Sequence, residues 1–147
     1  MNAIARRYRL PSIAFVLATI AIGCANSAFG RDLPLKMATF TVSVDAQQRF
    51  FEQIRQFASR TGFETKIVRI QEGSERFAII LTRDNLLIAG DNSSLDPGGQ
   101  SFRVERFEIG VYPYGMGTIP RSEAAELAGD FARTVVKAEG VTLSGMR

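Results

Sequence analysis

Carboxylates are the main catalytic side chains that this chain has to offer. It contains no histidine and a single cysteine, Cys24. Ser-His-Asp and Cys-His catalysis therefore lack a base, and zinc, copper and iron sites lose their usual ligands. A hydrolase built on paired carboxylates remains, and Asp84 with Asp91 is the pair that the sequence favours for it. No pattern forces these two into one cleft, so we expect no catalytic residues and no enzyme activity.

Asp84, Asp91 and Asp96, with Asn85 and Asn92, also offer oxygen ligands of the kind that hard cations bind. Their spacing matches no calcium-binding loop, and aspartate and asparagine at hairpin ends form turns with their own side chains. A phosphate-binding Walker loop and a dinucleotide fingerprint are also missing. We therefore expect no metal site and no cofactor.

A second group of residues has the composition of a protein-contact surface. Tyr112 and Tyr114 flank Pro113, and a loop containing two glycines follows at 115–118. Tyrosine and arginine dominate binding hot spots, and glycines let a loop adapt its backbone to a partner. We predict that the contact surface consists of Tyr112, Tyr114, Gly115, Gly117, Arg103 and Arg106.

Each part of that surface also has a structural interpretation. The tyrosines would serve to cap a sheet edge. Residues two apart on a strand share a face, so Arg103 would pair with Glu105 and Arg106 with Glu108. Surface ion pairs of this kind contribute little to stability. The glycine loop precedes a predicted helix, so its N–H groups would alternatively hold an anion.

The N-terminal stretch has the pattern of an export signal. Arg6, Arg7 and Arg9 form a basic region, and residues 13–22 are uncharged and mostly apolar. A run of this length is too short to cross a bilayer core, which takes about 20 helical residues. We therefore assign residues 1–30 to an export signal and tether, and residues 31–147 to a single domain.

Two cleavage sites fit this leader. The sequence Ala21-Ile22-Gly23-Cys24 resembles the lipobox of bacterial lipoproteins, in which the cysteine is lipidated and becomes the new N-terminus. The resemblance implies a periplasm-facing outer-membrane lipoprotein, because Ala25 is not the aspartate that retains many such proteins at the inner membrane. Alternatively, Ala28-Phe29-Gly30 is a small-x-small site that releases a soluble periplasmic protein at Arg31.

The charge balance argues against a polyanionic partner. Three of the 18 basic residues lie in the leader, so the rest of the chain carries 15 basic and 15 acidic residues. A net charge near zero does not favour nucleic-acid binding. We expect another envelope or effector protein as the partner, and membrane contact only through a lipid on Cys24.

Two segments have the apolar spacing of helices. In 45–60, Asp45 and Gln48 form a capping-box pattern, and Gly62 suits the left-handed position after the last turn. The predicted core stripe of this helix is Phe50, Phe51, Ile54, Phe57 and Ala58. A second helix is predicted over 121–139, with Gly140 as its stop and an apolar side made of Ala124, Leu127, Ala128, Phe131, Val135 and Ala138.

The strands surround a central hairpin. Two apolar runs, 77–81 and 86–89, flank the polar turn 82–85, and we expect Ile80 in the core. Further strands are predicted at 35–44, 64–71, 102–112 (with a bulge near Glu105-Arg106) and, for a short last strand, 141–143. The fold class is α+β, a two-layer sandwich in which two helices cover a mostly antiparallel β-meander of about four to five strands.

This order of elements, from Asp45 to Tyr112, resembles that of small exported immunity-type proteins that neutralise antibacterial effectors. The resemblance implies an exported, non-catalytic, protein-binding or inhibitory module of the bacterial cell envelope. It carries over no binding residue. Two alternatives stay open: a carboxylate-dependent hydrolase acting on envelope glycan, and a structural lipoprotein of an envelope assembly that uses a sheet edge for contact.

Overall fold

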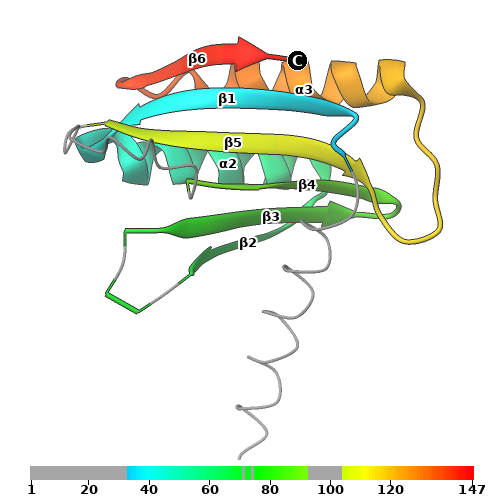
Figure 1. The fold of residues 1–147 in the computed structure, drawn as a ribbon, viewed down its shortest axis with the longest axis horizontal. Helices are drawn as coiled ribbons and strands as arrows, with labels where there is room; N and C mark the ends of the chain where they lie inside the picture. The colour runs from blue at the N-terminus through cyan, green and yellow to red at the C-terminus, as the bar shows by residue number, and fades with distance from the viewer. Residues whose placement is uncertain (1–32, 71, 74, 93–103) are drawn as a thin grey trace, which may run out of the picture. The chain divides into compact units, whose positions relative to one another are not determined.

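In the residues that the structure describes, six strands and two α-helices form an α+β fold (Figure 1). The computed structural model describes residues 33–70, 72–73, 75–92 and 104–147. Leu33–Arg147 belong to one compact unit. The elements in chain order are β1 (Lys36–Ser43), the 3₁₀ turn η1 (Val44–Ala46), α2 (Gln47–Thr61), β2 (Glu64–Arg69), β3 (Phe77–Arg83), β4 (Leu86–Asp91), β5 (Val104–Pro113), α3 (Arg121–Val135) and β6 (Val141–Met146).

The strands form one antiparallel sheet in the order β2-β3-β4-β5-β1-β6. Strands β2 to β5 are the predicted meander, and β1 lies between β5 and β6. The described sheet has six strands in all, compared with the about four to five expected for the meander. The last strand was expected only at 141–143, but it continues to Met146 and pairs with β1 over most of that strand.

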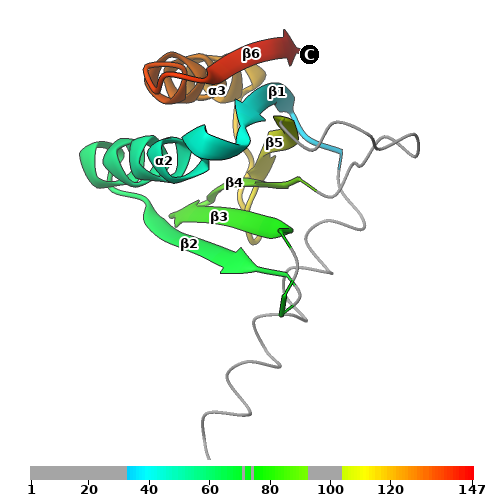
Figure 2. The same cartoon turned by 90° about the vertical axis from the view of Figure 1, so that its left-hand side faces the viewer.

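Both helices lie on the same face of the sheet (Figure 2). Helix α2 ends as predicted, because Gly62 adopts a left-handed φ of 77° and its N–H bonds to the Ala58 carbonyl. The predicted capping box at its start is wrong. Asp45 lies in the preceding 3₁₀ turn, and the N-cap position is Ala46, without a side-chain cap. Helix α3 ends at Val135, before the predicted stop at Gly140.

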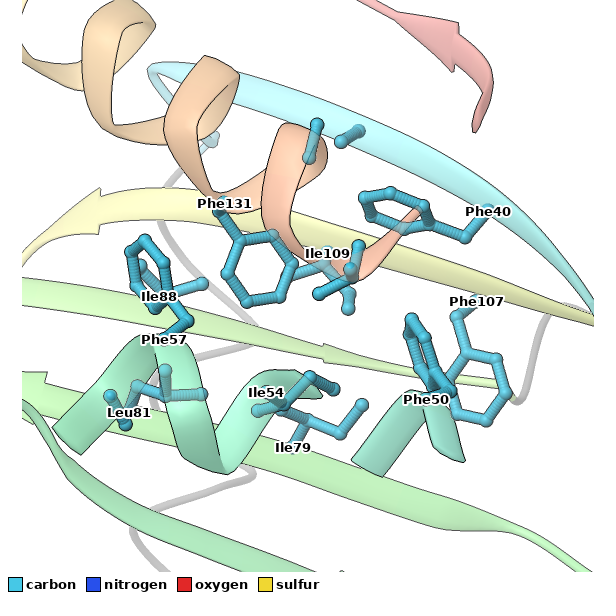
Figure 3. Close-up of a cluster of buried hydrophobic side chains, with 14 of the residues drawn as sticks. Phe40, Phe50, Ile54, Phe57, Ile79, Leu81, Ile88, Phe107, Ile109 and Phe131 are labelled. Carbon is cyan, nitrogen blue, oxygen red and sulfur yellow. The ribbon is translucent and has the colours of Figure 1, made fainter. Parts of the chain in front are cut away.

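Phenylalanine side chains between the helices and the sheet form the centre of the core (Figure 3). The ring of Phe50 in α2 lies 4.9 Å from that of Phe107 in β5. The ring of Phe131 in α3 meets that of Phe57 edge-on at 5.1 Å, a geometry that favours aromatic pairs. All five residues of the predicted stripe on α2 are buried, which confirms that interpretation. On the C-terminal segment, Ala124, Ala128, Phe131, Val135 and Ala138 are buried, and Leu127 packs against them.

The side chains of the central hairpin that point toward the helices differ from the prediction. Ile79 and Leu81 are fully buried in the core, whereas Ile80 is only partly buried and lies outside that cluster. Successive side chains of a strand point to opposite faces, so Ile80 lies on the outer face, away from the helices. Because β3 is apolar at consecutive positions, its sequence does not show which set faces the helices.

The predicted bulge near Glu105 is also wrong. Strand β5 pairs with β1 without a register shift from Val104 to Val111. The apolar phase changes because Glu105 takes a position on the helix side, where its Oε2 accepts a hydrogen bond of 2.8 Å from Gln47 Nε2. The register shift of this sheet lies instead in the pairing of β1 with β6, where Phe40 is opposite Leu143 and Thr39 is opposite Gly145.

Candidate protein-contact site

The loop after β5 is attached to the turn between β3 and β4. That turn holds Asp84, with a left-handed φ of 49°, and Asn85. The Tyr114 N–H donates to the Asn85 carbonyl at 2.7 Å, and Asn85 Nδ2 donates to the Thr118 carbonyl at 3.3 Å. Gly117 packs so closely that a Cβ there would lie 2.3 Å from the Asn85 Cβ. These contacts fix both ends of the loop.

The loop tip between these fixed ends is exposed and apolar. Tyr114 is 47% exposed, and Met116 is fully exposed at 105%. Gly115, between them, has a φ of 69°, a conformation that glycine adopts without strain. The composition of the loop pointed to Tyr114 and the two glycines, whereas Met116 was not among the predicted contact residues. Exposure is what distinguishes it, and no sequence periodicity in a loop shows exposure.

Tyr112 occupies a different environment from Tyr114. It is only 8% exposed, and its ring lies against Gly110, where a Cβ would come within 2.8 Å of the ring. Burial raises the pKa of its hydroxyl, and the Asp91 and Glu108 carboxylates add to this shift. Tyr112 therefore packs along the outer face of the sheet.

Of the two predicted arginines, Arg106 lies on β5 far from the loop tip. Its Nη2 donates to Glu108 Oε1 at 2.9 Å, and its side chain is 58% exposed. This confirms the surface ion pair that the strand parity predicted. Arg106 is six residues from Tyr112, about 20 Å at roughly 3.3 Å per residue. The structure therefore does not bring Arg106 to the tip. Arg103 and Cys24 lie outside the described residues.

The predicted carboxylate pair is separated. Asp84 lies in the turn before β4, and Asp91 is the last residue of that strand. Asp91 lies directly opposite Glu108 of β5 instead, a pairing that depends on strand register and was not visible in the sequence. Asn92 is structural, because its Oδ1 accepts from the Phe77 N–H at 2.7 Å. Asp96 lies outside the described residues.

Within the described residues, no three carboxylate, histidine or cysteine side chains gather as a metal site requires. In that same part of the chain, no helix has both the length and the apolar character needed to cross a membrane. No protein-family model matches the chain, and no curated protein sequence matches it. The loop tip Tyr114–Met116 is therefore the candidate site, on its geometry alone.

Proposed function

We propose that this protein is an exported, non-catalytic module of the bacterial cell envelope that binds another protein through the tip Tyr114–Met116. One observation carries the proposal: an exposed tyrosine and an exposed methionine extend from a loop whose two ends are bonded to Asn85. The glycines at 115 and 117 belong to the same surface.

The loop tip combines exposed apolar area with a base that is held in place. Methionine is flexible and polarizable and adapts to irregular partner surfaces, while tyrosine adds a stiff ring with a hydrogen-bonding hydroxyl. A loop already held in place loses less conformational entropy on binding than a free one, which leaves more of the contact energy as affinity. Tyr112, at 8% exposure, offers a partner little surface and supports the sheet beneath the loop.

A pull-down from the envelope fraction tests this function. Parent protein, Tyr114→Ala and Met116→Ser are compared with Met146→Ser, a matched change at another exposed methionine, 39% exposed at the end of β6. We expect each tip variant to weaken capture of the partner by about 1 kcal/mol or more, roughly fivefold. Met146→Ser should capture it like the parent. Equal capture by all four proteins would place the contact elsewhere.

We further propose that the partner is an effector that this protein inhibits, and that lipidation of Cys24 holds the module at the outer membrane. Mass spectrometry of the mature N-terminus tests the anchoring. An acylated Cys24, lost in Cys24→Ala, supports it. An unmodified N-terminus at Arg31 supports the soluble periplasmic form instead. Inhibition is tested separately, by measuring the activity of the captured partner with and without the protein.

A further inference from the structure

In the described part of the chain, the edge strand of the sheet beside α2 has no strand partner on its outer side. Among the described strands, β2 pairs only with β3, and it does so in unbroken register from Glu64 to Arg69 (Figure 2). The opposite edge strand, β6, is interrupted by a register shift, a common protection against pairing with other chains. Of the two edge strands in the described sheet, β2 is therefore the one with a regular edge.

The orientation of the backbone groups on β2 follows from one hydrogen bond. The Ile70 N–H donates to the Arg76 carbonyl at 2.8 Å, in the same register as the rest of the β2–β3 ladder. In an antiparallel pair, alternate residues turn their N–H and C=O groups toward the neighbour. Thr65, Ile67 and Arg69 therefore turn theirs outward, toward the free edge.

A groove runs beside this edge. It has a volume of about 540 Å³ and lies between β2 and the C-terminal half of α2, lined by Arg55, Ala58, Ser59, Phe63 and residues 65–68. Phe63 and Ala58 are buried and provide an apolar floor. Thr65 Oγ1 is buried there without a hydrogen-bond partner among the described residues.

The charge of the groove selects among peptides. Arg55 is the cation on its helix wall, and the described lining contains no carboxylate. Glu52 lies one turn earlier on α2 and does not line the groove. Glu64 shares the outer face of the sheet with Lys66, because side chains alternate along β2. A carboxylate entering from the helix side would therefore face Arg55 and no lining acid.

We propose that β2 accepts an extended acidic peptide of another protein as a seventh strand. Its backbone would bond to Thr65, Ile67 and Arg69, and alternate side chains would enter the groove, with a carboxylate beside Arg55. The outward-facing alternate side chains would lie next to Val68, which is 45% exposed. This surface is separate from the loop tip of the proposed function and does not depend on it.

A second copy of this chain fits the edge less well. Antiparallel pairing of β2 with itself around Ile67 would bring two grooves together, each with its own Arg55 and no lining carboxylate. Like charges placed close together oppose association. The charge of the groove therefore favours an acidic partner over self-association.

The experiment uses two octapeptide probes, one alternating glutamate with valine and one alternating lysine with valine. Fluorescence anisotropy measures binding, and amide hydrogen exchange followed by NMR locates it. We expect the glutamate peptide to bind about tenfold more tightly than the lysine peptide, and to slow exchange at Thr65, Ile67 and Arg69. Methylating the peptide backbone nitrogens should abolish binding, because an added strand needs those N–H donors.

Charge reversal on the groove wall gives the sharpest control. Arg55→Glu should invert the preference, so that the lysine peptide now binds more tightly. Arg121→Glu, a matched change at an exposed site on α3, and Met116→Ser at the loop tip should both bind like the parent. No slowing of exchange at Thr65, Ile67 and Arg69, or an unchanged preference in Arg55→Glu, would overturn the proposal. A dimer that protects these amides without peptide would also overturn it.

Discussion

Two neighbouring isoleucines on β3 provide a direct test of how the sheet faces its helices. Ile79 is fully buried in the core, and Ile80 is partly exposed on the outer face. Replacing Ile79 with alanine removes about three buried carbons, at about 0.8 kcal/mol each, and leaves a cavity that the surrounding side chains fill only in part. We expect a loss of roughly 2–5 kcal/mol in the free energy of unfolding.

The same substitution at Ile80 should cost about 1–2 kcal/mol, because the site opens toward solvent and no closed cavity forms. Urea unfolding followed by circular dichroism measures both values on otherwise identical proteins. With a slope of about 2 kcal/mol per molar urea, Ile79→Ala should lower the midpoint by about 1 M or more. An Ile80→Ala protein that loses as much stability as Ile79→Ala would contradict the assignment of Ile79 to the helix side of β3 and Ile80 to its outer side.

Three further outcomes follow from the structure. Gly90→Ala should destabilise the protein by about 1–3 kcal/mol, because its Cβ would lie 2.0 Å from the Glu108 carbonyl oxygen, whereas Gly145→Ala, with no atom within 4 Å, should be nearly neutral in urea unfolding. Asn92→Ala should cost about 1–3 kcal/mol in the same assay, since it leaves the Phe77 N–H without its acceptor. Burial raises the pKa of Tyr112 above its ordinary value of about 10, so the folded state holds this proton more tightly than the unfolded state. The stability that the protonated Tyr112 contributes is therefore present below about pH 10 and is lost as the pH rises through the raised pKa. The fall in Tm above about pH 10 should be smaller in Tyr112→Phe than in the parent.

The sequence was sufficient for the features that depend on local chemistry. The spacing of Phe50, Ile54 and Phe57 predicted the buried side of α2, and Gly62 predicted its end. Both depend on residues within a few turns of one another, where the helical period governs contact. The order of the elements and the antiparallel meander followed in the same way from turn residues and apolar runs.

Features set by distant pairing were not predictable. The facing of Ile80 depends on which side of the sheet the helices cover, and an apolar strand carries no signal for that choice. The change of apolar phase in β5 was misinterpreted as a bulge. Glu105 occupies a position on the helix side instead, where Gln47, far away in sequence, donates a hydrogen bond to its carboxylate. At the candidate site, composition suggested both tyrosines, but only the packing of Tyr112 on Gly110 distinguishes it from Tyr114.

Site-specific photo-crosslinking at the loop tip tests the proposed function most directly. A photoreactive phenylalanine analogue replaces Met116, and in a matched protein it replaces Leu143, a 38% exposed residue of β6. Irradiation of intact cells should join the Met116 variant to one protein of the envelope, and that product should disappear when Tyr114→Ala is added. The Leu143 variant should give no such product. If the two positions give the same products, or if Met116 gives none, the loop tip is not the protein-contact surface.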